Sequence, residues 1–206
     1  MRVIGVDPGL TRCGVGIVDG TPGARPQFVA VGVIRTDPHT EHAYRLLAIE
    51  EGLGEWFDHY QPQAISIERV FAQHNLSTVT GIGQVAGIAM MLGARHGIDV
   101  ALHTPSEVKS AVTGSGRADK AQVGVMVAQV LHLAKAPTPA DAADALALAV
   151  THLWRGSAQN RYATAALQGR SSAAVARARR SAAIARAARS RTERQASSTR
   201  GTRGSS

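Results

Sequence analysis

Two short apolar runs that each end in an acid constrain the fold of this chain more than any other feature. Residues 2–7 end in Asp7, and residues 64–68 end in Glu68. Both runs are short and apolar, which is typical of buried strands. The segment between them includes residues 40–60, where apolar side chains recur at helical spacing. A helix that precedes the second strand favours a parallel crossover, and this connection brings the two strand ends to one edge of a sheet.

The remaining pattern predicts an α/β domain built on a mixed five-stranded sheet. Apolar runs at 13–18 and 28–34 are separated by Asp-Gly and Pro-Gly turns, so the first three strands should form an antiparallel meander. A fifth strand is expected at residues 100–104. The expected helices cover residues 40–60, 76–95, 105–112, 120–133 and 140–154. This order of elements favours a sheet with helices on both faces.

Charge divides the chain into two regions. Residues 1–155 hold 12 Lys and Arg and 14 Asp and Glu, whereas residues 156–206 hold 11 Arg and a single acid, Glu193. The net charge is therefore −2 in the first region and +10 in the second. The second region is rich in Arg, Ala and Ser and has too few apolar residues to build a core. We predict a folded domain over residues 1–155 and a disordered basic tail over 156–206 that attracts nucleic acid.

The cysteine content and the N-terminus favour a soluble, cytoplasmic protein. Cys13 is the only cysteine, so no intramolecular disulfide can form, which fits a reducing compartment. The chain opens directly into an apolar strand without the basic and apolar regions of a signal peptide. The most apolar long stretch, residues 79–94, is too short and too rich in Gly to span a bilayer.

Two further acids lie on the last expected helix. Asp141 and Asp144 are three residues apart, so they share one helical face, where like charges repel. Asp141 alone could be explained as part of a helix start with Thr138 as N-cap and Pro139 at the first position. Asp7 alone could begin a turn. Together, however, oxygen ligands without Cys or His partners are the donors that Mg²⁺ and Mn²⁺ prefer, which predicts metal-assisted phosphoryl chemistry.

Four segments of the chain together resemble the bacterial RuvC Holliday junction resolvases. The resemblance covers residues 1–155 in order, and its motifs are Val-Asp-Pro-Gly-Leu-Thr-Arg-Cys-Gly-Val-Gly, Ile-Glu-Arg-Val-Phe-Ala-Gln-His-Asn, His-Thr-Pro-Ser-Glu-Val-Lys-Ser-Ala-Val-Thr-Gly-Ser-Gly and Ala-Asp-Ala-Ala-Asp-Ala-Leu-Ala-Leu-Ala-Val-Thr-His. It implies an RNase H-like fold, a homodimer, and Mg²⁺-dependent paired nicks in four-way DNA junctions that leave 5′-phosphate ends. It also implies a role in recombination and repair, with a RuvA–RuvB branch-migration complex as partner.

The resemblance carries the catalytic and metal-binding roles onto Asp7, Glu68, Asp141 and Asp144. Two Mg²⁺ ions, which Mn²⁺ could replace, would then activate water and stabilise the leaving oxygen. We expect Asp7 to be the central ligand and Glu68 and Asp141 to hold one metal each. Asp144 would be a further ligand or a nearby base. The long Arg-rich tail departs from the family pattern, and no role is carried onto it.

Three basic residues and one aromatic residue are candidate DNA contacts. Lys109, Arg117 and Lys120 flank a Gly-Ser-Gly loop, and the resemblance implies that Lys109 and Lys120 touch the scissile phosphate region. Without the resemblance, a solvated helix face is the preferred explanation of these charges. Phe71 could stack on an unpaired base at the junction centre, or it could anchor the core. The eight histidines show no ligand spacing and are interpreted as surface or packing residues.

The helix at 76–95 is rich in small residues and is the candidate dimer interface, although ordinary packing on the sheet would also explain it. Three other functions are compatible with parts of the sequence. A YqgF-type nuclease of ribosomal RNA precursors shares the Asp-Pro-Gly start, but such chains are shorter and lack the Ala-Asp-Ala-Ala-Asp-Ala ending and the Phe71 segment. An actin/Hsp70-like ATPase needs a second domain that this chain cannot hold. A non-catalytic junction-binding protein would not need four intact acids.

Overall fold

The computed structural model describes residues 1–21, 24–69 and 76–167, which form a five-stranded mixed sheet in the order β3-β2-β1-β4-β5. The strands are β1 (Arg2–Asp7), β2 (Arg12–Asp19), β3 (Gln27–Arg35), β4 (Ala64–Glu68) and β5 (Asp99–His103). β1, β2 and β3 pair antiparallel, whereas β1, β4 and β5 pair parallel. The meander and the parallel crossover expected from the sequence are both confirmed.

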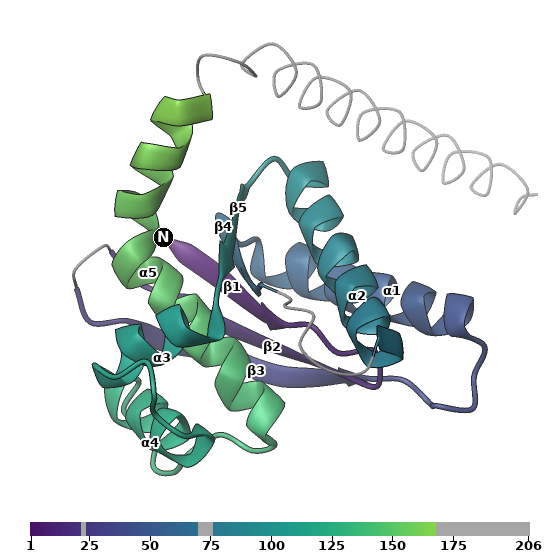
Figure 1. The fold of residues 1–206 in the computed structure, drawn as a ribbon, viewed down its shortest axis with the longest axis horizontal. Helices are drawn as coiled ribbons and strands as arrows, with labels where there is room; N and C mark the ends of the chain where they lie inside the picture. Colours follow the sequence, from purple (N-terminus) through teal and green to yellow (C-terminus); the bar gives the residue numbers. More distant parts are fainter. Residues whose placement is uncertain (22–23, 70–75, 168–206) are drawn as a thin grey trace, which may run out of the picture.

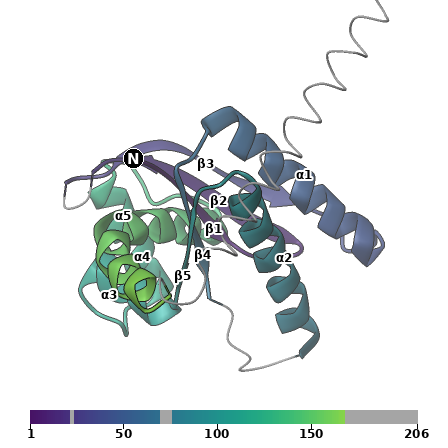
Figure 2. The same ribbon diagram turned by 90° about the horizontal axis from the view of Figure 1, so that it is seen from above.

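Helices cover both faces of this sheet, as predicted (Figures 1 and 2). One face carries α1 (His42–Tyr60) and α2 (Leu76–Arg95), and the other carries α3 (Pro105–Thr113), α4 (Lys120–Val130) and α5 (Ala140–Leu167). Each face has its own apolar cluster of buried side chains. Burial of these two clusters is the main favourable contribution to folding. The fold class is α/β and RNase H-like.

Alternation along β1 and β4 decides which side chains meet α5. Val3 packs in the α5 cluster, whereas Ile4 and Val6 pack in the α1–α2 cluster. Because side chains alternate along a strand, Asp7 is in phase with Val3 and faces α5. On β4, the Ser66 hydroxyl donates a 2.8 Å hydrogen bond to a carbonyl of α5. Glu68 is two residues further on, so it lies on the same face.

Glycines on β1 and β2 bring α5 unusually close to the sheet. A Cβ atom built on Gly5 would lie 2.0 Å from the carbonyl oxygen of Ala145, and one built on Gly14 would lie 2.0 Å from that of Asp141. No side chain could fit at these distances, so the backbones of the strands and of α5 are in direct contact. This contact sets the start of α5 beside the end of β1.

The element bounds differ from the expected ones mainly in the last two helices. α4 ends at Val130, three residues before the expected end, and α5 continues to Leu167 instead of ending near Trp154. α5 begins at Ala140, which places Pro139 just before the helix and not at its first position. Among the described residues, no helix is both long enough and apolar enough to span a membrane. Phe71 and the tail beyond residue 167 lie outside the described residues.

Candidate active site

Asp7 and Glu68 lie side by side at the ends of two parallel strands. The last pair of the β1–β4 ladder is Val6 with Ile67, and each acid directly follows its member of that pair. Both side chains are partly buried, and they lie close enough for each to shift the pKa of the other. Two acids this close in a partly buried setting favour a proton on one of them, because two ionised carboxylates would repel.

The surroundings of this pair favour the protonated form. Burial, followed by the charges of Glu68 and Asp144, raises the pKa of Asp7 to about 8. Burial also raises the pKa of Glu68, with a smaller contribution from Asp144, while Lys120 and Lys109 oppose the shift. Because the two groups interact strongly, the proton belongs to the pair and not to one member. At neutral pH the pair therefore carries less negative charge than two separate carboxylates would.

The acids of α5 are neutralised in a different way. Asp141 Oδ2 lies 3.0 Å from Arg12 Nε, and Asp144 Oδ2 lies 2.9 Å from Lys120 Nζ. The Asp144 contact is also a hydrogen bond. The Asp141 Oδ2 atom is buried and accepts no hydrogen bond among the described residues, so the Arg12 contact is a close charge pair without hydrogen-bond geometry. Each helix acid therefore has a cation of the protein beside it.

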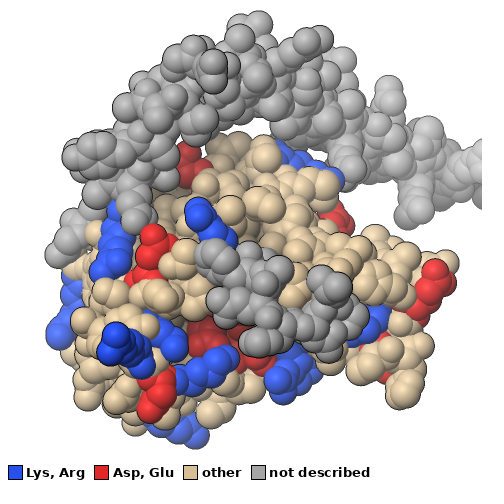
Figure 3. Space-filling model, in the orientation of Figure 1, with Lys and Arg blue, Asp and Glu red and all other residues tan. Residues whose placement is uncertain are grey.

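All four predicted acids thus gather where the ends of β1 and β4 meet the start of α5. The charge of Asp144 acts on both Asp7 and Glu68, which places the helix acid close to the strand pair. A Cβ on Gly14 would lie 3.3 Å from the Asp7 Cβ and in collision with the Asp141 carbonyl, so those two residues flank the same point of β2. Figure 3 shows acidic atoms in a recess of the molecular surface with basic side chains beside them.

The chemistry of this donor set fits a hard divalent cation, because every donor is a carboxylate oxygen. Within residues 1–21, 24–69 and 76–167, no three acidic, Cys or His side chains are oriented around one point as metal ligands. The ion pairs explain this orientation, since Arg12 and Lys120 hold the two helix carboxylates. Metal binding at these acids would therefore require the shared proton to leave and the two cations to give way.

Two of the three predicted basic contacts lie at the acids. Lys109 and Lys120 line a hollow of about 190 Å³, which we call the lysine hollow. Its walls come from β4, α3, α4 and α5 and consist of Glu68, Pro105, Val108, Lys109, Lys120, Val123, Asp144 and Leu148. Arg117 is exposed in the loop between α3 and α4 and does not line this hollow. The structure therefore brings Lys109 and Lys120 to the acids but leaves Arg117 apart from them.

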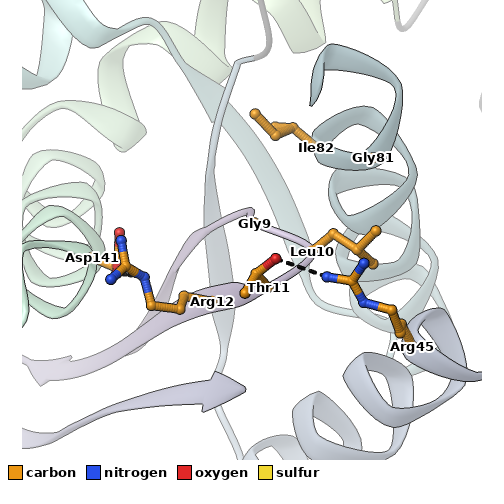
Figure 4. Close-up of a pocket in the computed structure, with 8 residues that line it drawn as sticks. All are labelled: Gly9, Leu10, Thr11, Arg12, Arg45, Gly81, Ile82 and Asp141. Atoms are coloured by element: carbon orange, nitrogen blue, oxygen red, sulfur yellow. Dashed lines mark hydrogen bonds and ion pairs between the residues drawn. The ribbon is translucent and has the colours of Figure 1, made fainter. Parts of the chain in front are cut away.

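A second hollow, of about 350 Å³, adjoins the acids on the side away from the lysine hollow. We call it the turn hollow, because the turn between β1 and β2 forms its floor (Figure 4). It is lined by Gly9, Leu10, Thr11, Arg12, Arg45, Gly81, Ile82 and Asp141. The sequence prediction did not include its arginines as site residues. Arg12 lies in the first of the four motifs and could have been predicted as a site residue for that reason. Nothing in the helical pattern around Arg45 marks Arg45 as a site residue.

Two of the histidines form a buried pair, and one of them, His103, is the ladder partner of Glu68. His103 on β5 and His152 on α5 are almost fully buried, and their ring centroids lie 5.8 Å apart. Burial lowers the pKa of His103 to about 4 and also lowers the pKa of His152, so both rings are neutral at pH 7. The packing interpretation of the histidines holds for these two.

The sheet order and the carboxylates at the β1 and β4 ends and on the last helix define a class, the RNase H-like nucleases. The family model described as crossover junction endodeoxyribonuclease RuvC matches residues 3–152. The chain belongs to the RuvC family of crossover junction endodeoxyribonucleases.

Individual relatives agree with this assignment. The RuvC protein of Cutibacterium acnes is 65% identical over 164 residues, which cover 80% of this chain and 84% of the relative. The Thermobifida fusca RuvC protein is 61% identical, with 80% and 91% covered. Among solved structures, T. thermophilus RuvC in complex with a Holliday junction substrate matches with a TM-score of 0.72 and 31% identity, covering 76% of this chain and 94% of the other.

Proposed function

We propose that this enzyme resolves four-way DNA (Holliday) junctions by paired, symmetric, metal-dependent nicks during homologous recombination and DNA repair. The observation that carries the proposal is the convergence of Asp7, Glu68, Asp141 and Asp144 at one sheet edge, in a chain of the RuvC family. The T. thermophilus relative was solved with a Holliday junction substrate, which supports the same substrate for this chain. The products would carry 5′-phosphate ends.

In this proposal Mg²⁺, which Mn²⁺ could replace, supplies a water nucleophile of lowered pKa and neutralises charge on the phosphate oxygens. Asp7 would be the central ligand, with Glu68 and Asp141 on either side of it. Asp144 would be a further ligand or would orient a ligand. Two ions per site would suit four carboxylates, because each ion needs negative oxygen donors. The raised pKa of Asp7 means that this group must lose its proton before it can act as a ligand.

Lys109 and Lys120 would hold the scissile phosphate from the lysine hollow, which also contains Glu68 and Asp144. Lys120 now pairs with Asp144, and its long side chain is 72% exposed, so it can turn to a phosphate. Arg117, exposed in the neighbouring loop, would add a contact to the DNA backbone further from the acids. We also propose that Phe71 stacks on an unpaired base at the junction centre. Phosphate contacts of this kind strengthen binding without reading sequence.

Symmetric cleavage calls for two copies of the site related by a two-fold axis. We propose a homodimer that uses the outer face of α2. Cβ atoms built on Gly83 and Gly87 would meet nothing within 4 Å, and Met90 and Met91 are 37% and 44% exposed. A surface of small residues and exposed Met suits close contact with a second copy. We further propose a cytoplasmic enzyme whose basic segment 156–206 attracts DNA, with a RuvA–RuvB complex as partner.

The decisive experiment compares a synthetic four-way junction with a linear duplex of the same sequence. We expect symmetric nicks only in the junction and only with Mg²⁺, and no cleavage with EDTA. Equal cleavage of both substrates would contradict junction selectivity, and cleavage of structured RNA alone would favour the YqgF-type alternative. Analytical ultracentrifugation at micromolar concentration tests the dimer separately, and a monomer there would contradict it.

A further inference from the structure

The turn hollow contains an arginine that is held in place by neutral partners. Arg45 Nε donates a 3.0 Å hydrogen bond to Thr36 Oγ1, and Arg45 Nη2 donates a 2.8 Å hydrogen bond to Thr11 Oγ1. The Thr36 hydroxyl in turn donates to the carbonyl oxygen of Leu10 at 2.5 Å. This network links the start of α1 to the β1–β2 turn and to the end of β3. It fixes the direction of the guanidinium group before any ligand arrives.

The charge of Arg45 is not neutralised by this network. Two threonine hydroxyls carry no charge, and among the described residues Arg45 has no carboxylate within 4.0 Å. The guanidinium group has five N–H donors, and these two bonds use only two of them. A fixed, partly buried cation with donors to spare is suited to bind an anion, since little conformational entropy is lost on binding.

The opposite wall of the turn hollow carries Arg12, whose side chain reaches across to Asp141 (Figure 4). The hollow therefore contains two guanidinium groups and one carboxylate, an excess of one positive charge. Gly9 and Gly81 form part of the wall. A phosphodiester is the ligand whose single charge and paired oxygens suit such a site.

The position of the turn hollow relates it to the acids. It shares Asp141 with them, whereas the lysine hollow shares Glu68 and Asp144. The lysine hollow is lined by residues of β4, α3, α4 and α5, whereas the turn hollow is lined by the β1–β2 turn, α1, α2 and the start of α5. The acids thus stand between two basic hollows. A nucleic-acid strand with its scissile phosphate at the acids would have neighbouring phosphates over the turn hollow.

We propose that Arg45, oriented by Thr11 and Thr36 and assisted by Arg12, forms a phosphodiester-binding subsite that holds the cleaved strand beside the scissile phosphate. The subsite rests on the proposed function for its substrate. It adds a specific anchor that positions the strand along the line from the lysine hollow across the acids. Thr11 and Thr36 are positioning residues, because they act through Arg45.

The first test measures how the affinity for a four-way junction depends on salt, with the full chain and EDTA so that no strand is cut. Each phosphate neutralised by a cationic side chain adds about 0.9 to the slope of log affinity against log salt. We expect Arg45→Gln to lower the slope by about 0.9, and Arg45→Lys to keep the slope. The matched control is Arg95→Gln, which removes the same charge from α2, where Arg95 pairs with Glu50. It should leave the slope unchanged.

An unchanged slope in Arg45→Gln, or an equal loss in Arg95→Gln, would overturn the subsite. Thermal melting of each variant separates a binding effect from a folding effect, because a purely structural Arg45 would change the melting temperature and not the slope. Thr11→Val offers a variant that keeps the charge. It should weaken junction binding while the slope stays that of the wild type.

The second test identifies the phosphate itself. Junctions in which one phosphodiester near the cut is replaced by a neutral methylphosphonate are compared position by position. At one position the wild type should lose about tenfold or more in affinity, the size of a charge-assisted hydrogen bond. At that position alone, the methylphosphonate should leave the affinity of Arg45→Gln for the junction unchanged. If all positions cost the variant as much as the wild type, the subsite is wrong.

Failure of the proposed function would look different from failure of the subsite. A wild-type protein that binds junction and linear duplex equally well contradicts the substrate proposal before any variant is compared. A wild-type protein that selects the junction, together with an Arg45→Gln variant of unchanged slope, contradicts only the subsite.

Discussion

The two strand acids and the two helix acids meet at one site but are neutralised in opposite ways. Asp7 and Glu68 share a proton, and burial, together with neighbouring negative charge, raises the pKa of both. Asp141 and Asp144 instead lie beside Arg12 and Lys120. The difference follows from position, because the strand ends are enclosed by α5, whereas the start of α5 lies beside the first residues of β2 and α4, which are Arg12 and Lys120.

This comparison shows how a cluster of four acids can exist without metal. Four ionised carboxylates at this distance would repel one another strongly in a partly buried site. One proton and two protein cations remove most of that repulsion. A divalent cation at these acids would have to displace each of these partners, so the metal-free arrangement would set the pH and the concentration at which the site fills.

The largest expected effect is on the rate of junction cleavage, which should depend more on the strand acids than on Asp144. If Asp7 is the central ligand, Asp7→Asn should lower the junction cleavage rate by about a thousandfold or more, since a metal supplies several kcal/mol of transition-state stabilisation. Asp144→Asn should cost about 10- to 100-fold, as expected for a group that orients a ligand. Both variants should still bind junctions. Single-turnover cleavage in Mg²⁺ measures the rates, and wild-type activity in Asp7→Asn would refute the assignment.

A second effect is on the pH dependence of the Mg²⁺ requirement. Below a pH of about 8 the strand pair holds its proton, and that proton must leave before Asp7 can act as a ligand. The Mg²⁺ concentration for half-maximal cleavage should therefore fall by up to about tenfold per pH unit from pH 6 to 8 and level off above. A requirement that is constant over this range would show that the pair is already ionised.

A third effect concerns stability without metal. Because its pKa is raised, Asp7 contributes stability that is present at low pH and is lost as the pH rises through about 8. Asp7→Asn has no proton to lose. With EDTA, we expect the variant to melt several degrees above the wild type at pH 9 and close to it at pH 5. Melting curves at both pH values test this, and a variant that is less stable at pH 9 would contradict the shared-proton arrangement.

The fold could be predicted from the sequence because its signals are local. Strand runs, turns and helical spacing each follow from neighbouring residues, and the crossover rule then fixes the parallel pair. The meeting of Asp7 with Glu68 followed from the same rule. That Asp141 and Asp144 share a helical face could be read from their spacing, and the resemblance supplied their placement at the strand ends.

The partners of the acids could not be predicted in this way. Arg12 reaches Asp141 because β1 and β2 form a tight turn and because Gly14 lets α5 approach the sheet. These are contacts between residues far apart in the sequence, which no local pattern encodes. Arg45 is a similar case, since its hydrogen bonds to Thr11 and Thr36 depend on how α1 packs beside the β1–β2 turn.

The smallest expected effect tests the helix pair. The Lys120 side chain is 72% exposed, so Lys120→Gln should cost the metal-free protein less than about 1 kcal/mol. Asp141 is only 19% exposed and its Oδ2 accepts no hydrogen bond among the described residues, so Arg12→Gln should cost somewhat more, about 1 kcal/mol. Urea unfolding with EDTA measures both, and Arg95→Gln gives the value for an ion pair outside the site.

Mg²⁺ should offset the loss of stability in Arg12→Gln. Arg12 competes with a divalent cation for Asp141, so its removal should let Mg²⁺ stabilise Arg12→Gln more than the wild type, by an amount that grows with Mg²⁺ concentration. Arg95→Gln should gain no more than the wild type. If Mg²⁺ stabilises Arg12→Gln less than the wild type, Arg12 assists metal binding, and the helix acids are then held ready for the metal and not blocked by their cations.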